Sequence, residues 1–332
     1  EEILGAMSEP MINHRGPEFK EILYRVTDGL KQVFETEGDV YILTTSGTGA
    51  MEAAIVNTLS PGDSVLCASA GAFGERFGLI ASTYGADVTD LTFPLAGGVD
   101  PDAIRDALKS GPDIKAVLVV HNETSTGVRS DVPGVRAAID RAGHPALLMV
   151  DAVSSLCAMD LLHDEWGVDV TITGSQKGLM LPPGLSFAAV SRKALDAHQK
   201  AELPRSYWDW SAMLTSNESG YFPYTPATNL LYGLDEALVS LAYDAETSGG
   251  LLIAVNEADA QALEAALDDR GVLAVRIGAM VEGTGAGASV TSVEPDERNS
   301  ATFTAPASSV VVVTAIAPKT LVPARFRLDV TE

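Results

Sequence analysis

Polar residues follow three apolar, strand-like segments of this sequence, and their types suggest a shared chemistry. Lys177 comes after the apolar segment 168–173, and Asp151 directly follows the apolar segment 146–150. The turn Ser-Gly-Thr-Gly at 46–49 lies between a short strand and a helix. An amine, a carboxylate and a glycine-containing turn at successive strand ends could together hold a phosphorylated, cationic ring that carries an aldehyde.

Each of these features also has an ordinary structural interpretation. A partly desolvated lysine amine can form an imine, but Lys177 alone would more simply be a solvated loop residue. Asp151 is costly to bury unless it is paired, for example with a protonated pyridine nitrogen; the alternative is a helix N-cap. The turn 46–49 offers helix N–H groups to a phosphate, but it lacks the Lys-Ser/Thr ending of a nucleotide-binding loop, and such turns are often purely structural.

The order of the three features is more specific than any one of them. The turn, the carboxylate and the lysine occupy successive strand ends of one segment of the chain. Pyridoxal 5′-phosphate (PLP) has the phosphate, the ring nitrogen and the aldehyde that these groups would bind. We therefore predict that Lys177 holds PLP as a Schiff base and that Asp151 pairs with the ring nitrogen.

The segments that position these residues alternate between strand and helix patterns. Strands are expected at 40–43, 64–67, 116–120, 146–150 and 168–173, and helices at 2–6, 18–37, 50–59, 101–110, 133–142 and 194–202. This alternation indicates a largely parallel sheet with helices on both faces, in which ligands bind beyond the carboxyl ends of the strands. The predicted fold class is α/β, with a smaller α+β segment towards the C-terminus.

Composition and charge limit the possible partners. The chain has 332 residues and a formal net charge of −23, which argues against nucleic-acid or anionic-membrane partners. No apolar stretch approaches the roughly 18 residues of a membrane span, and no signal peptide is expected, although the chain begins at Glu1 without Met. Cys67 and Cys157 lie in apolar runs, which favours reduced, buried thiols in a cytoplasmic protein and no metal site.

Several ordered segments resemble the class V aminotransferases of PLP fold type I, especially the alanine–glyoxylate and serine–glyoxylate group. The resemblance covers about residues 7–241. It is carried by the segments 11–19, 45–53, 120–127, 150–155, 164–169 and 174–179. The resemblance implies a PLP-dependent transaminase that moves an amino group from alanine or serine to a 2-oxo acid such as glyoxylate.

The resemblance also implies a role for each matching residue of the cofactor site. Lys177 would be the Schiff-base lysine and proton shuttle, and Asp151 would pair with the ring nitrogen. Phe73, which would otherwise be an ordinary core residue, would stack on one ring face where the family often has Trp, and Val153 would pack on the other. Thr124 would lie near the ring hydroxyl. The phosphate would be bound by Ser46, Gly47, Thr48 and Gln176.

Thr225 matches a family residue that reaches the phosphate of the neighbouring subunit. The resemblance therefore implies a homodimer. The family's nearby Tyr is replaced by Phe222 in this sequence.

The character of the sequence changes after about residue 241. The family's small domain, with the arginine that clamps the substrate carboxylate, is not recognisable there. Residues 244–295 instead resemble the C-terminal domain of selenophosphate synthetases (selenide, water dikinases), beginning with Asp-Ala-Glu-Thr-Ser-Gly-Gly-Leu-Leu. No dikinase activity is expected, because the ATP-binding half of that family is absent. Strands are expected at 251–255 and 310–313, a helix at 257–269 and a loop at 283–300.

Arg276 has two interpretations. It could be the substrate-carboxylate clamp, because the aminotransferases carry a similar Arg-Ile-Gly-x-Met segment, or a surface arginine after a strand. We predict a PLP-transferase large domain at 1–241, a synthetase-like fragment at 242–295 and a tail at 296–332. The alternative function is a truncated or fused protein that binds PLP but has little or no turnover; a lyase or desulfurase on the same fold is a further alternative.

Overall fold

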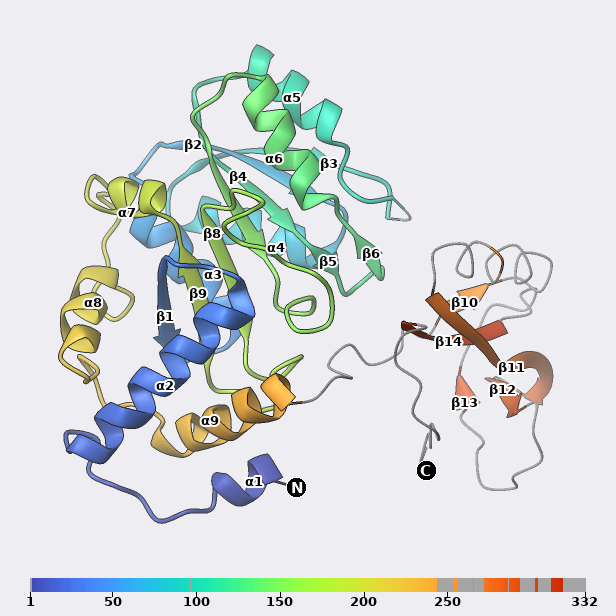
Figure 1. Cartoon of the computed structure of the whole chain (residues 1–332). Helices are drawn as coiled ribbons and strands as arrows, with labels where there is room; N and C mark the ends of the chain where they lie inside the picture. The colour runs from blue at the N-terminus through green and yellow to red at the C-terminus, as the bar shows by residue number, and fades with distance from the viewer. Residues whose placement is uncertain are drawn as a thin grey trace. The chain divides into compact units, whose positions relative to one another are not determined.

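The computed structural model divides the chain into two compact units, Glu1–Asp244 and Ala245–Glu332. It describes residues 2–95, 97–243, 253–255, 265, 272–285, 287–292, 302–303 and 312–318. Each unit contains a sheet of its own (Figure 1). The predicted chemistry lies entirely in the first unit, apart from Arg276.

The first unit is built on a seven-stranded mixed sheet. Its strands, in spatial order, are β1 (Asp39–Leu43), β9 (Ser186–Val190), β8 (Val170–Gly174), β7 (Leu147–Asp151), β4 (Ile114–Val120), β2 (Ser64–Ser69) and β3 (Asp87–Thr92). The pairs from β8 to β3 are parallel, whereas β9 runs antiparallel to both β1 and β8. The predicted α/β fold with a mostly parallel sheet is confirmed.

Helices cover both faces of this sheet (Figure 1). The helices of the first unit are α1 (Glu2–Ala6), which packs on α9, and α2 (Pro17–Phe34), α3 (Gly47–Thr58), α4 (Ala72–Thr83), α5 (Pro101–Ser110), α6 (Val132–Arg141), α7 (Arg192–His198), α8 (Trp210–Glu218) and α9 (Thr228–Tyr243). Buried side chains from α3, α4, α7 and α8 pack against one face of the sheet. Residues from α2 and α9, and from α5 and α6, pack against the other face.

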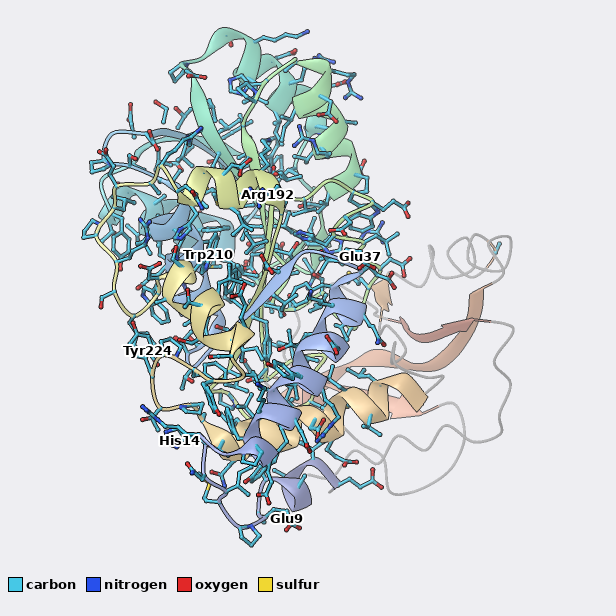
Figure 2. All side chains as sticks on the ribbon, turned by 60° about the vertical axis from the view of Figure 1, so that its left-hand side comes forward. Glu9, His14, Glu37, Arg192, Trp210 and Tyr224 are labelled. Atoms are coloured by element: carbon cyan, nitrogen blue, oxygen red, sulfur yellow. The ribbon has the colours of Figure 1, made fainter. Side chains whose placement is uncertain are left out.

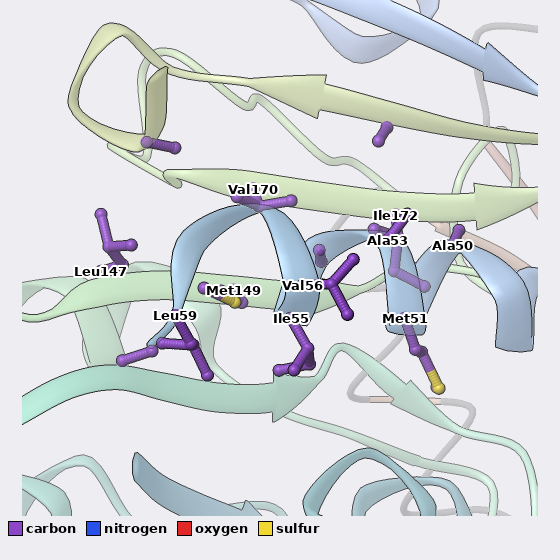
Figure 3. Close-up of a cluster of buried hydrophobic side chains, with 14 of the residues drawn as sticks. Ala50, Met51, Ala53, Ile55, Val56, Leu59, Leu147, Met149, Val170 and Ile172 are labelled. Atoms are coloured by element: carbon purple, nitrogen blue, oxygen red, sulfur yellow. The ribbon is translucent and has the colours of Figure 1, made fainter. Parts of the chain in front are cut away.

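The strands divide their side chains between these two layers with a period of two. In β1, Tyr41 and Leu43 join the core beneath α3, whereas Val40 and Ile42 join the core beneath α2. Figure 3 shows how closely α3 lies on the sheet, with Ile55 among its inward-facing side chains. Because both faces of the sheet are covered at β4, β7 and β9, these strands are apolar along nearly their whole length, whereas the edge strand β3 has no buried residue.

The position of α3 differs from the prediction in a way that matters for the site. A helix was expected to begin near Ala50, but α3 begins at Gly47, directly after Ser46. Two glycines in its first turn concealed the start, since glycine is a poor helix former. As a result, Gly47 and Thr48 belong to the helix N-terminus rather than to a loop before it.

Several elements of the first unit were not predicted from the sequence. These are β3, β9, α4, α8 and α9, together with the short hairpin strands β5 (Asn122–Glu123) and β6 (Val128–Arg129). Most of the predicted elements are present with small shifts at their ends, but α7 ends at His198 instead of continuing to 202.

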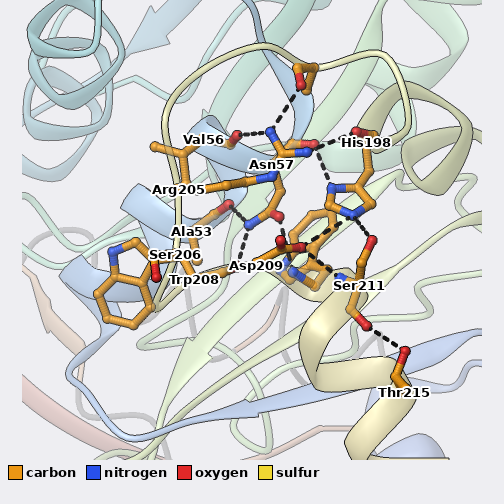
Figure 4. A network of polar contacts seen from close by, with 12 residues as sticks. Ala53, Val56, Asn57, His198, Arg205, Ser206, Trp208, Asp209, Ser211 and Thr215 are labelled. Carbon is orange, nitrogen blue, oxygen red and sulfur yellow. Dashed lines mark hydrogen bonds and ion pairs between the residues drawn. The ribbon is translucent and has the colours of Figure 1, made fainter. Parts of the chain in front are cut away.

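A polar network links α8 and the segment before it to α3 and α7 (Figure 4). The side-chain amide of Asn57 donates to the carbonyl oxygens of Ala53 at 2.7 Å and Trp208 at 2.6 Å, and its oxygen accepts from the backbone N–H of Trp210 at 3.1 Å. Nε2 of His198 lies 2.7 Å from Oγ of Ser211. Trp210 is fully buried, and its ring stacks on that of Tyr41 at 5.4 Å between centroids. This network is therefore structural.

Figure 2 labels Glu9, Glu37 and Arg192 among the exposed side chains of the first unit. Among the described residues, no helix is long and apolar enough to cross a membrane. Cys67 is buried, as predicted, but Cys157 is only half-buried; both are free thiols. Burial raises the pKa of each thiol to about 12, so neither is poised as a nucleophile.

The second unit contains a five-stranded antiparallel sheet. Its strands, in spatial order, are β10 (Ile253–Val255), β14 (Val312–Pro318), β11 (Val272–Gly285), β12 (Gly287–Ser292) and β13 (Thr302–Phe303). The loop expected at 283–300 is wrong for 283–285 and 287–292, which continue β11 and form β12. Thr and Val suit a pleated strand, and cross-strand pairing overrides the glycine-rich composition there. The helix expected at 257–269 lies almost wholly outside the described residues.

Candidate cofactor site

A cavity of about 170 Å³ brings together the predicted cofactor residues of the first unit. It is lined by Ser46, Gly47, Thr48, Met51, Phe73, Arg76, Asn122, Thr124, Asp151, Val153, Ser154, Gln176 and Lys177. These residues come from segments at the carboxyl ends of β1, β2, β4, β7 and β8, where a parallel sheet places its ligands. A larger hollow of about 510 Å³ lies between α1, α2 and α9, but no lysine lines it.

The N-terminus of α3 offers unpaired donors to one side of the cavity. Ser46 has an extended backbone, and its side chain does not cap the helix. The first helical hydrogen bond runs from the N–H of Ala50 to the carbonyl oxygen of Ser46. The N–H groups of Gly47, Thr48 and Gly49 therefore have no partner within the described part of the chain. Free N–H groups and the positive end of the helix dipole together suit a phosphate.

Gly47 is required by close packing at this helix start. A Cβ atom at Gly47 would lie 2.6 Å from Cγ2 of Val153, which is closer than real contacts allow. The absence of a side chain lets the loop after β7 approach α3. The phosphate-type turn and the predicted ring-packing residue Val153 are thus fitted to each other.

Asp151, the last residue of β7, is a buried carboxylate that lacks a cationic partner. It is 3% exposed, and the backbone N–H of Val153 donates to its Oδ1 at 2.8 Å. No arginine, lysine or histidine in the described ranges forms an ion pair with it. Burial raises the pKa of this carboxyl group to about 7; the charge of Glu123 adds to the rise, whereas the hydrogen bond from Val153 and the charge of Arg76 oppose it. A protonated ring nitrogen would supply the missing partner.

Gln176 and Lys177 follow β8 and complete the cavity. The side-chain oxygen of Gln176 is buried and accepts no hydrogen bond from the described residues. Lys177 is exposed, and its backbone carbonyl oxygen accepts from the N–H of Met180 at 2.8 Å, which closes a turn after the lysine. The cavity lining therefore includes the unpaired side-chain oxygen of Gln176 and the accessible amine of Lys177.

Serine and asparagine residues that the sequence analysis did not single out organise another wall. Oγ of Ser154 accepts from Nδ2 of Asn122 at 2.8 Å and from Oγ1 of Thr124 at 2.9 Å, and donates to the carbonyl oxygen of Asn122 at 3.0 Å. Asn122 is two residues before Thr124, and Ser154 directly follows Val153. Their polar side chains at these positions could have indicated from the sequence that they line the cavity.

Phe73 lies on α4 together with Arg76, a further cavity residue that was not predicted from the sequence. The guanidinium carbon of Arg76 lies 4.9 Å from the centroid of the Phe73 ring, a cation–π arrangement. The i, i+3 spacing brings the two side chains to one helix face. This spacing could have indicated Arg76 as a cavity residue only if the helix α4 had been predicted from the sequence.

Two predicted residues do not line this cavity. Thr225 is exposed in the segment between α8 and α9. The neighbouring Phe222 packs edge-on against Phe19 with 6.2 Å between ring centroids. Arg276 lies within β11 of the second unit, paired with Thr314, and its side chain is outside the described part of the structure.

Comparison with known protein families identifies the family to which this chain belongs. The model of the aminotransferase class V family matches residues 4–245. The chain belongs to this family. Curated relatives include an L-aspartate–glyoxylate aminotransferase of Paracoccus denitrificans, 46% identical over 71% of this chain and 60% of the relative, and a serine–glyoxylate aminotransferase of Methylorubrum extorquens, 45% identical over 72% and 61%. The chain thus spans about three fifths of the length of these relatives.

Solved structures of aminotransferases have the same fold. A Thermus thermophilus aspartate aminotransferase of subgroup IV is 30% identical with a TM-score of 0.70, over 95% of this chain and 89% of that one. An alanine–glyoxylate aminotransferase from Nostoc is 26% identical with a TM-score of 0.71, over 94% and 85%. The family implies PLP as cofactor. The described residues fit it through the free N-terminus of α3, the unpartnered Asp151 carboxylate, the unpaired Gln176 oxygen and the accessible Lys177 amine.

Proposed function

We propose that this protein is a PLP-dependent transaminase that moves an amino group from a small amino acid, alanine or serine, to a 2-oxo acid such as glyoxylate. The observation that carries the proposal is the cavity that Lys177 shares with a buried Asp151 carboxylate, which forms no ion pair with any described residue. The relatives named as aminotransferases that use glyoxylate support the acceptor. Aspartate is a further candidate donor, because one relative is named for it.

In this proposal each wall of the cavity has a separate task. PLP supplies an aldehyde and a ring that acts as an electron sink when its nitrogen is protonated. The N–H groups at the start of α3 bind the phosphate, with Gln176 beside them. Asp151 keeps the proton on the ring nitrogen. Phe73 and Val153 pack on the ring, and Thr124 lies at the ring hydroxyl.

Lys177 has two tasks in the proposed reaction. Its Nζ would hold the aldehyde of bound PLP. When free, the same Nζ would act as the base that takes the proton from the substrate α-carbon and as the acid that returns it.

We further propose a cytoplasmic homodimer in which Thr225 contacts the phosphate in the partner's site. The exposure of Thr225 supports this proposal, because a residue that serves another subunit must lie at the surface of its own. The net charge of −23 supports a protein without nucleic-acid or membrane partners.

For the C-terminal part we propose a fusion, with a PLP-transferase domain at 1–241, a selenophosphate-synthetase-like fragment at 242–295 and a tail at 296–332. The end of the family match at residue 245 and the sequence resemblance of 244–295 support it. If Arg276 does not clamp the substrate carboxylate, the second candidate function applies: a protein that binds PLP with little or no turnover.

Titration with PLP, followed by addition of amino acids, tests both candidates. The wild-type protein should develop the visible absorption band of lysine-bound PLP, and Lys177→Ala should not. Serine, alanine or aspartate should then abolish this band, and glyoxylate should be converted to glycine. A band that persists with every donor and yields no glycine would establish the binding-only alternative, whereas absence of the band in the wild type would contradict both.

A further inference from the structure

Glu123 is a second buried carboxylate next to the cofactor cavity, and the mechanism proposed above does not use it. It is 1% exposed and lies in β5, which pairs with β6 in a two-stranded hairpin. No lysine, arginine or histidine within the described ranges forms an ion pair with it. A buried charge of this kind is costly unless hydrogen bonds compensate it.

Four hydrogen bonds provide that compensation, and two of them come from the first turn of α4. The backbone N–H groups of Phe73 and Gly74 both donate to Oε2 of Glu123 at 3.1 Å. The backbone N–H and the hydroxyl of Ser125 donate to Oε1 at 3.1 Å and 2.6 Å. The carboxylate thus acts as the cap of a helix that begins about fifty residues earlier in the chain, and it lies at the positive end of that helix.

The chain around this contact is shaped to admit the glutamate. A Cβ atom at Gly71, the residue before α4, would lie 2.6 Å from Cγ of Glu123 and 2.6 Å from Oγ of Ser125. Only a glycine lets the helix start approach the carboxylate this closely. Ser125 adds a second link, because its Oγ accepts from the N–H of Ala72 at 3.1 Å.

Both sides of this contact belong to the cofactor cavity. Phe73 and Arg76 extend from α4 into its lining, and Asn122 and Thr124, the two neighbours of Glu123 in the chain, line it from the hairpin. One buried side chain therefore connects the wall that carries the ring-stacking residue to the wall that carries the residue predicted to lie near the ring hydroxyl.

We propose that Glu123 is a positioning residue of the cofactor site, which holds Phe73 on α4 and Thr124 on the hairpin at the separation that the PLP ring requires. This inference rests on the proposed function for the identity of the cofactor. Glu123 itself is not among the residues that line the cavity.

Glu123→Gln is the sharpest test, because it keeps the shape of the side chain and removes the charge. Only one of its two polar atoms can accept, so its NH₂ group must face either the donors of α4 or those of Ser125. The matched control is Glu75→Gln, the same change on an exposed residue of α4 whose side chain makes no hydrogen bond or ion pair among the described residues. Ser125→Ala, which removes the 2.6 Å hydrogen bond to Oε1, is a milder second variant.

The readouts are the dissociation constant of PLP, the visible circular dichroism of the bound PLP and the thermal unfolding midpoint. Glu123→Gln should weaken PLP binding about tenfold, equivalent to about 1.4 kcal/mol, and should change the dichroism of the cofactor that remains bound. Ser125→Ala should change the PLP dissociation constant and the dichroism in the same direction, but by less. Glu75→Gln should match the wild type in both.

A lowered unfolding midpoint with wild-type PLP affinity and dichroism would show that Glu123 supports only the fold, and would overturn the inference. If Glu123→Gln does not fold, Ser125→Ala decides by the same two spectroscopic readouts. Failure of the proposed function is separable, because a wild type that binds PLP but forms no glycine leaves these comparisons valid. A wild type that does not bind PLP overturns both.

Discussion

The backbone N–H of Val153 donates to Oδ1 of Asp151 at 2.8 Å, and this is the hydrogen bond that holds the buried carboxylate at the end of β7. The contact folds the loop after β7 back on its own strand, so that Val153 faces the first turn of α3. One short segment therefore places both the carboxylate predicted at the ring nitrogen and the side chain predicted beneath the ring. Burial at this position raises the pKa of Asp151 to about 7.

That raised pKa predicts a pH dependence of the protein without PLP. Between about pH 4 and about pH 7 the folded protein holds a proton on Asp151 that the unfolded chain has lost, so this group's contribution to stability is lost as pH rises through that window. Asp151→Asn removes the effect. The variant should be more stable than the wild type by a few kcal/mol near pH 8 and by almost nothing near pH 4.

The measurement is the free energy of urea unfolding of both proteins, without and with PLP, across this pH range. With PLP present the order should reverse, because only the wild type can pair with the ring nitrogen. A stability difference that is the same at every pH would contradict the assignment.

His163 predicts the opposite pH dependence. Its Nδ1 lies 2.8 Å from Oγ1 of Thr171, its Nε2 is buried without a partner among the described residues, and burial lowers its pKa to about 4. A depressed histidine pKa stabilises the fold above about pH 6.5, and this stability is lost as pH falls towards about 4. His163→Asn keeps a polar group near Thr171 and should flatten the acid side of the stability profile. An unchanged acid slope in this variant would contradict the prediction.

The close approach of Gly47 and Val153 predicts energetic coupling. Gly47→Ala places a methyl group against Cγ2 of Val153 and should destabilise the protein by about 1–3 kcal/mol, while weakening PLP binding. Val153→Ala should relieve much of that cost when the two changes are combined. A double-mutant cycle on urea unfolding measures it: a coupling energy of about 1 kcal/mol is expected, and strict additivity would show that the two sites are independent.

Thr225 predicts a link between PLP affinity and dimer formation. Thr225→Ala should weaken PLP binding several-fold without changing the fold, since the side chain is exposed in its own subunit. Thr89→Ala, at another exposed threonine whose side chain makes no hydrogen bond among the described residues, is the matched control. Light scattering should show a dimer. The predicted contact would be overturned if the wild-type protein were a monomer and its affinity for PLP equalled that of both variants.

The sequence alone points to Asp151 and Lys177 because they come after apolar strands, whereas Phe73, Thr124 and Val153 were implied only by the family resemblance. The end of β7 is marked by five buried residues ending in Asp151, and strand alternation then fixes which edge of the sheet it occupies. Residues that reach the cavity from α4 could not be found in this way. That helix starts at a glycine-rich segment, and its cap is Glu123, which is remote in sequence.

The strands that were missed show two different limits. The edge strand β3 carries Asp, Thr and Asp, and most of its residues are exposed or half-buried, so it has no apolar pattern. The strand β9 is fully buried, but it follows the turn after Lys177, and its antiparallel pairing with β1 and β8 depends on contacts between distant segments. Local sequence does not encode such pairing.

Trapping the cofactor on its lysine tests the central claim most directly. The protein is incubated with PLP, the imine is reduced with borohydride, and the digested peptides are analysed by mass spectrometry. The prediction is a phosphopyridoxyl group on the peptide that contains Lys177, and its loss in Lys177→Ala. A label spread over exposed lysines such as Lys109 and Lys200, or retained at the wild-type level by Lys177→Ala, would contradict it.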